Sequence, residues 1–184
     1  MSPDWHAKLD LFLRGVRTPA LKMTVLRVRD EELALDLLQE AMIGFVAAAR
    51  RFEEDAWQRL FYRILLRRIT DWQRKRGWRE RIARILPFSA LGEGDDGGEA
   101  RDPEGEPAAS AQDCHAADAL AEALEQALQR LPARQQEAWL LRQWQGLSVQ
   151  EAAAAMGCSE GSVKTHLSRA MRALREQLGD WIDE

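Results

Sequence analysis

The segment from residue 131 to residue 178 constrains the fold of this chain more than any other part of its sequence. Two short helical patterns flank a turn with the sequence MGCS. Ser148, followed three positions later by Glu151, is the pattern of a capping box that starts a helix. Gly157 stands where a helix end favours a left-handed residue, and Ser159 suits the cap of the next helix. The segment therefore predicts a helix-turn-helix, which places its second helix in the major groove of DNA.

The second predicted helix separates an apolar side from a polar and basic side. At about 100° per residue, Val163, Leu167, Ala170, Met171, Leu174 and Leu178 share one face. The outward face and its edges carry Ser162, Lys164, Thr165, His166, Ser168, Arg169 and Arg172. An ordinary helical hairpin with a solvated basic face is the alternative reading. The glycine turn, both caps and the slim helix over residues 149–156 together favour DNA binding.

The net charge of −4 conceals a strong segregation of charge along the 184 residues. Residues 50–84 hold twelve basic and five acidic side chains, a balance of +7. Residues 89–117 hold eight acidic side chains and one arginine, a balance of −7. Charge segregated in this way steers a polyanion to one face of a protein. A nucleic-acid partner is therefore compatible with an acidic chain.

The sequence predicts an all-α protein with two small helical domains joined by a flexible acidic linker. Helical spacing of apolar residues runs through 1–86 and 118–184, and no convincing strand alternation interrupts it. Residues 87–117 are rich in Gly, Pro, Ala and acidic side chains, with little to bury, which is typical of a flexible linker. Hydrophobic residues make up 46% of the chain, enough for one large or two small domains.

Several short motifs are spread over both halves of the chain. In the C-terminal half they are Leu131-Pro132, Gly146-Leu147-Ser148, Glu151-Ala152-Ala153 and Gly161-Ser162-Val163-Lys164-Thr165. In the N-terminal half they are DLLQEAM at residues 36–42, WQRLFYRI at 57–64 and DWQRKR at 71–76. Together they resemble the extracytoplasmic-function (ECF) group of bacterial sigma factors. The C-terminal motifs alone would also fit response-regulator output domains, and the N-terminal motifs favour the sigma factors.

The resemblance implies a role for each half of the chain. Residues 1–86 would form a domain like sigma region 2, which binds core RNA polymerase and the −10 promoter element. Residues 118–184 would form a domain like sigma region 4, whose second helix reads the −35 element through the outward residues named above. Core binding is expected from Asp36, Gln39 and Glu40, and −10 binding from Arg63, Arg67, Arg68, Asp71, Arg74, Lys75 and Arg76. Arg67 replaces the Asn that is usual in the family, which puts the promoter-melting contact at this position in question.

Aromatic residues interleave with the basic side chains of the −10 candidate helix. Trp57, Phe61, Tyr62 and Trp72 could stack on unpaired bases or fill the protein core. Helical spacing favours the core for Trp57 and Phe61 and leaves Trp72 open.

The function implied by the resemblance is an alternative sigma factor that directs promoter-specific transcription initiation and is not itself an enzyme. Its expected partners are core RNA polymerase and promoter DNA, with an anti-sigma factor as a further candidate and no small-molecule substrate. A helix-turn-helix regulator that binds DNA without polymerase, and a protein-interaction module, are the alternatives. The acidic linker is read either as an RNA mimic within the polymerase or as a solubilising tether.

Residues of the kinds that build catalytic, metal and membrane sites are few. We expect no cofactor and no metal, since Cys114-His115 has no second ligand pair at a suitable spacing. Two cysteines, no apolar run of membrane-spanning length and no recognisable signal peptide favour a cytoplasmic protein without membrane insertion.

Overall fold

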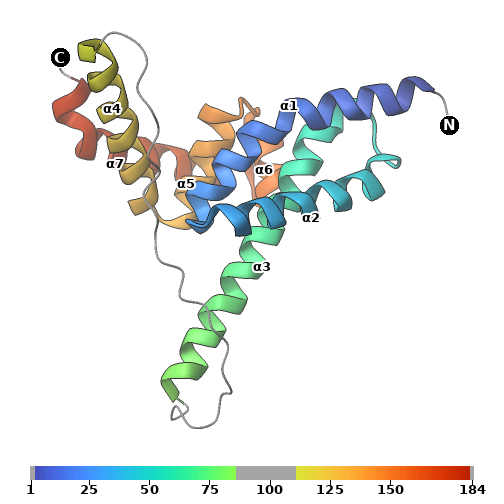
Figure 1. The fold of residues 1–184 in the computed structure, drawn as a ribbon, viewed down its shortest axis with the longest axis horizontal. Helices are drawn as coiled ribbons and strands as arrows, with labels where there is room; N and C mark the ends of the chain where they lie inside the picture. The colour runs from blue at the N-terminus through green and yellow to red at the C-terminus, as the bar shows by residue number, and fades with distance from the viewer. Residues whose placement is uncertain (1–2, 86–110, 183–184) are drawn as a thin grey trace.

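A computed structural model describes residues 3–85 and 111–182, and within these ranges the chain forms helices and turns without a strand. The first unit contains α1 (Pro3–Val28), α2 (Glu31–Ala49), a short 3-10 turn, η1 (Glu54–Ala56), and α3 (Trp57–Ile85). α1 and α2 run side by side, and α3 crosses them before its C-terminal half extends away from the rest of the molecule (Figure 1). The all-α prediction is confirmed.

The second unit contains α4 (Ala111–Arg130), α5 (Ala133–Trp139), the π-helical segment η3 (Leu140–Trp144), α6 (Val149–Met156) and α7 (Glu160–Ile182). α4 begins inside the predicted linker of residues 87–117, so that prediction was wrong for residues 111–117. The physical reason is composition. Glycine and proline end before Ala111, and the alanine-rich stretch that follows has a high helix propensity. The rest of the predicted linker lies outside the described residues.

The core of the first unit is built on one stripe of α2. Ala34, Leu38, Ala41 and Phe45 are buried against α1 and α3. The rings of Phe12, Phe45, Trp57 and Phe61 pack edge-on or tilted, with centroids 5.0 to 6.1 Å apart. Trp57, Phe61 and Tyr62 are buried, so the core interpretation of Trp57 and Phe61 is confirmed. Their rings are unavailable for stacking on bases in this arrangement.

The predicted helix-turn-helix is present with its predicted caps. The Ser148 hydroxyl accepts from the Glu151 amide at 3.1 Å, and the Glu151 carboxylate accepts from the Ser148 amide at 2.8 Å. α6 ends at Gly157 in the left-handed conformation, with φ of 64°. Ser159 caps α7 by accepting from the amide of Ser162 at 3.1 Å. These local contacts fix the angle at which α7 leaves the turn.

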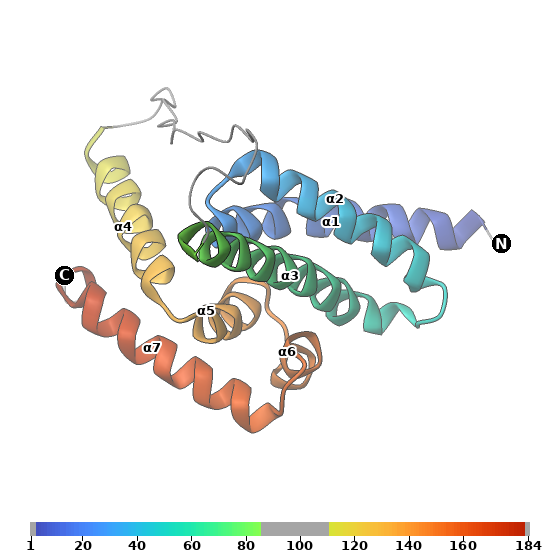
Figure 2. The same cartoon turned by 90° about the horizontal axis from the view of Figure 1, so that it is seen from below.

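The two units pack together through α6, which lies against both α3 and α7. In the view of Figure 2, α5 and α6 lie beside α3, and α7 lies on the outer side of α5 and α6. Buried residues from both units belong to one continuous hydrophobic cluster. The two helical domains expected from the sequence therefore share a core.

Candidate nucleic-acid interface

α7 presents its polar side to solvent and buries its apolar side. Lys164, Thr165, Ser168, Arg169 and Arg172 are exposed, and Ser162 and His166 are half-buried at the edges. Val163, Ala170, Leu174 and Leu178 are buried against the rest of the second unit. Arg172 lies 3.9 Å from Glu176 along the same helix, in an exposed pair that salt screens. The predicted recognition residues thus form one accessible polar and basic surface.

Arg134 secures the helix that supports α7. Its guanidinium donates to the carbonyl oxygen of Met156, in the last turn of α6, at 3.0 Å. It also donates to the Glu137 carboxylate at 3.1 Å. Because the last carbonyls of a helix have no partner within the helix, this contact satisfies one of them and ties α6 to α5. Both contacts engage the Arg134 guanidinium within the protein.

The seven −10 candidates on α3 do not all share one face. On a helix turning about 100° per residue, Arg63, Arg67 and Arg74 fall within about 40° of one another. All three are exposed. Asp71 lies beside them, 3.8 Å from Arg67. We call Arg63, Arg67 and Arg74 the basic face of α3.

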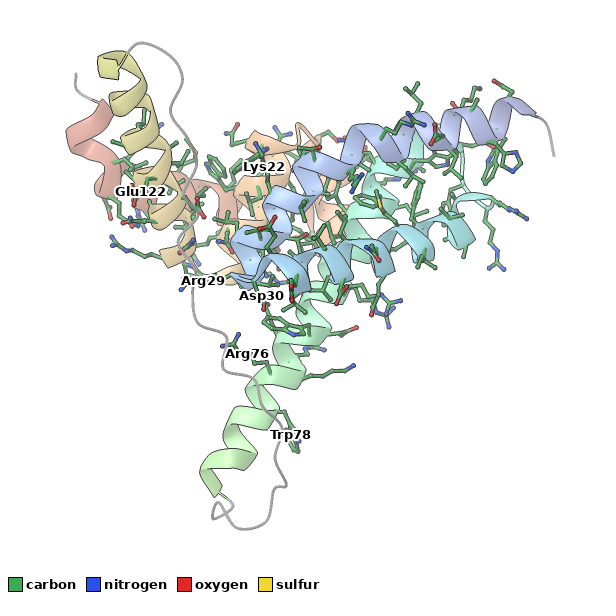
Figure 3. The ribbon with its side chains drawn as sticks, in the orientation of Figure 1. Lys22, Arg29, Asp30, Arg76, Trp78 and Glu122 are labelled. Carbon is green, nitrogen blue, oxygen red and sulfur yellow. The ribbon has the colours of Figure 1, made fainter. Side chains whose placement is uncertain are left out.

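The other predicted cations of α3 point elsewhere. Arg68 pairs with Glu40 of α2 at 3.3 Å, and Lys75 follows one heptad later on that side. The guanidinium of Arg76 stacks over the Trp72 ring, 5.5 Å from its centroid. Figure 3 shows Arg76 and Trp78 on different sides of α3. The helix therefore offers cations around much of its surface, with three of the predicted seven aligned.

Trp78 is an exposed aromatic residue that the sequence analysis did not single out. Its ring is 65% exposed, whereas tryptophan is usually highly buried. It lies one turn after Arg74 and within about 60° of Arg63 around the helix, so it shares the basic face. The available signal was its spacing of four residues from Arg74 and eleven from Arg67.

The predicted polymerase-binding residues lie on the outward side of α2. Asp36, Gln39 and Glu40 are exposed, opposite the buried stripe. Ile43 stands among them, one turn after Gln39, and is 71% exposed. The sequence analysis also missed Ile43, although its offset from the core stripe was readable from helical spacing. Ile43 is thus an exposed apolar side chain next to the polar residues Asp36, Gln39 and Glu40.

Across residues 3–85 and 111–182, no group of His, Cys, Asp and Glu side chains is placed to hold a metal ion. None of the described helices combines the length and the apolar character that a membrane span needs.

Comparison with known proteins identifies the family. Residues 10–79 match the family model for sigma-70 region 2, and residues 121–174 match that for sigma-70 region 4. The RNA polymerase sigma-E factor of Streptomyces coelicolor is 33% identical over 155 residues, covering 82% of this chain and 75% of that protein. The ECF RNA polymerase sigma factor BldN of the same species is 50% identical over 58 residues, 32% of this chain and 22% of its own. The chain belongs to the ECF sigma factors.

A solved structure has a fold similar to that of this sigma factor. It is the sigma factor RpoE of Bartonella quintana in complex with the anti-sigma factor NepR, with a TM-score of 0.66, 27% identity and complete coverage of both chains. The predicted resemblance is confirmed. As a family member, the protein is a transcription initiation factor that binds core RNA polymerase and promoter DNA.

Proposed function

We propose that α7 reads the −35 element through its exposed polar face. The support is the solvent-facing set that includes Lys164, Thr165 and Arg169, held in place by the capped turn. Arg169 is the strongest candidate for a base edge, because it is exposed and no described residue pairs with it. Arg172, with its acidic neighbour Glu176, suits a phosphate contact that positions the helix.

The basic face of α3 holds the −10 element, with Trp78 as a stacking residue. Arg63, Arg67 and Arg74 supply the positive charge that a nucleic-acid backbone requires. When the strands separate, an unpaired base loses the neighbours on which it stacked. An exposed aromatic ring next to phosphate-binding cations offers it a new stacking surface. Trp78 combines this exposure with this neighbourhood. Trp57, Phe61 and Tyr62 act in the core instead.

The outward side of α2 docks on core RNA polymerase. Ile43 supplies an apolar anchor, and Asp36, Gln39 and Glu40 supply a polar and acidic rim. The exposed pair between Glu40 and Arg68 connects this surface to α3, the helix that carries the basic face. The functional units correspond to residues 1–86 and 118–184, the second extended to Ala111 by α4.

An anti-sigma factor is a further proposed partner, since the RpoE of Bartonella quintana is seen with NepR. A cytoplasmic location follows from the proposed partnership with RNA polymerase. The observation that carries the proposed function is the separation of three exposed surfaces with different chemistry on α2, α3 and α7.

Transcription in vitro with core polymerase and a promoter library tests the proposal. Discrete start sites are expected only when the chain and core enzyme are mixed. Ile43→Glu should abolish these products and weaken core binding. Leu11→Glu on α1 is the matched control, because Leu11 is equally exposed at 73% and lies outside the proposed surface. Stable operator binding with no polymerase-dependent products would favour a non-sigma regulator.

A further inference from the structure

Two hydroxyl groups near the start of α7 are engaged within the protein. The Thr165 hydroxyl donates to the carbonyl oxygen of Gly161, one turn earlier, at 2.9 Å. The Ser162 hydroxyl lies 2.9 Å from that of Ser159, the residue that caps α7. Ser and Thr hydroxyls that bond to nearby groups of their own segment are less available to other partners. The first turns of α7 therefore offer fewer free hydroxyl groups than their sequence suggests.

The methyl group of Thr165 is the part of this side chain that remains for a ligand. The methyl and the hydroxyl share one Cβ, so the bond to Gly161 fixes the rotamer and with it the direction of the methyl group. A helical side chain leans toward the turn before its own Cα, which for Thr165 is the turn of Gly161. Gly161 has no side chain, and Thr165 is exposed. The preceding turn therefore leaves the methyl group uncovered at this position.

Thr165 lies where a recognition helix meets the edges of bases. It belongs to the second turn of α7, and the N-terminal residues of such a helix contact bases in the major groove. α7 lies on the outer side of α5 and α6 (Figure 2). Thr165 shares its face with Ser168 and Arg169, which are exposed and pair with no described residue. This surface combines one apolar group with two free polar side chains.

A methyl group on that surface has the chemistry to recognise thymine. In the major groove, thymine is distinguished by its C5-methyl group, and a threonine methyl is one of the apolar groups that contact it. A free hydroxyl could instead donate to a purine N7 or accept from an amino group, and would discriminate poorly. Because the Thr165 proton is bound to Gly161, donation to a base would first require that bond to break.

We propose that Thr165 reads a thymine of the −35 element through its methyl group, and that its hydroxyl holds the methyl group in place. This inference rests on the proposed function of α7. The spacing also places the thymine. Thr165 and Arg169 lie about 6 Å apart along the helix, and successive base pairs are about 3.4 Å apart. With α7 lying along the groove, we expect the thymine about two base pairs from the base that Arg169 contacts.

Deoxyuridine substitution tests this contact, because uracil lacks the methyl group of thymine and keeps its hydrogen-bonding groups. The probe is a promoter recovered from the library, with each thymine of the −35 element replaced in turn on either strand. Holoenzyme formed from core polymerase and the full chain binds this probe in competition with the unmodified promoter. One replacement should weaken binding about fourfold, which is the contribution of one buried methyl group.

Two substitutions separate the methyl group from the hydroxyl. Thr165→Ser keeps the hydroxyl and removes the methyl, so it should abolish the uracil effect at that position. Thr165→Val keeps a methyl and removes the hydroxyl, so it should retain most of the effect. Thr18→Ser is the matched control, because Thr18 is an exposed threonine of α1 outside the proposed surfaces. It should leave the uracil effect unchanged, and circular dichroism of each variant checks that the helices are intact.

The outcomes separate this contact from the proposed function. A −35 element in which no thymine is sensitive to uracil overturns the contact. A uracil effect that survives Thr165→Ser also overturns it, as does one that Thr165→Val abolishes, since the hydroxyl would then read the base. If randomising the whole −35 element leaves holoenzyme binding unchanged, α7 does not read that element, and the proposed function falls together with this inference.

Discussion

Replacing Gly157 by alanine tests the helix-turn-helix geometry with one methyl group. Gly157 adopts φ of 64° at the end of α6, and a Cβ built there meets no atom within 4 Å. That distance excludes the atoms of Gly157 and of its two chain neighbours. Any destabilisation must therefore come from the local backbone, because an L-residue in the left-handed region places its Cβ too close to a neighbouring carbonyl oxygen. The expected loss is about 1–2 kcal/mol in the free energy of unfolding.

The matched control is the same substitution at Gly15. A Cβ at Gly15, inside α1, also meets nothing within 4 Å, and its φ lies outside the left-handed region. Gly15→Ala should stabilise the protein by about 0.5–1 kcal/mol, since alanine has the higher helix propensity. Urea unfolding followed by circular dichroism measures both midpoints. The two variants must shift in opposite directions, and a Gly157→Ala protein as stable as the wild type would refute the reasoning.

Three further predictions concern the proposed surfaces and the cap. Arg169→Ala should weaken recognition of the −35 element by about 1–3 kcal/mol, measured as competition between promoter sequences. The unfolding temperature of the protein should stay unchanged, because the Arg169 side chain is exposed. Trp78→Ala should reduce permanganate reactivity of the opened −10 region, Trp78→Phe should largely retain it, and equal loss in both would contradict stacking. The hydrogen bond from Ser148 holds the pKa of the Glu151 carboxyl below its ordinary value of 4.5. A carboxyl whose pKa is lower in the folded state than in the unfolded state stabilises the fold above pH 4.5. This stabilisation is lost as the pH falls through the folded-state pKa. The stability difference between wild type and Glu151→Gln should therefore narrow on acidification below pH 4.5, and a pH-independent difference would argue against the ionised cap.

The helix-turn-helix was predictable because its chemistry is local. Ser148, Glu151, Gly157 and Ser159 each act on atoms within a few residues along the chain. Helical periodicity likewise separated the buried and exposed sides of α2 and α7. The start of α4 at Ala111 was missed because the linker was inferred from average composition, in which alanine counts as weakly as glycine.

The contacts between the units could not be predicted from the sequence. Arg27 and Glu137 are 110 positions apart, and charged residues are usually solvated, so nothing in either helical pattern marks them as buried partners. The exposures of Trp78 and Ile43 depend on which sides of α2 and α3 the other helices cover. Periodicity marks the side of a helix on which each residue lies, and the packing determines whether that side stays exposed.

The alanines of α6 show how one short segment meets two demands. A helix-turn-helix needs a slim first helix so that the second can approach closely, and the run at Ala152–Ala155 provides it. Small residues of the same helix also let α3 approach α6 closely. Because alanine buries little area, much of the specificity of the contact between the units comes from the polar bonds of Arg27 to Glu137 and of Gln145 to Pro19. Exchanging Arg27 or Gln145 should therefore loosen that contact more than it unfolds either unit.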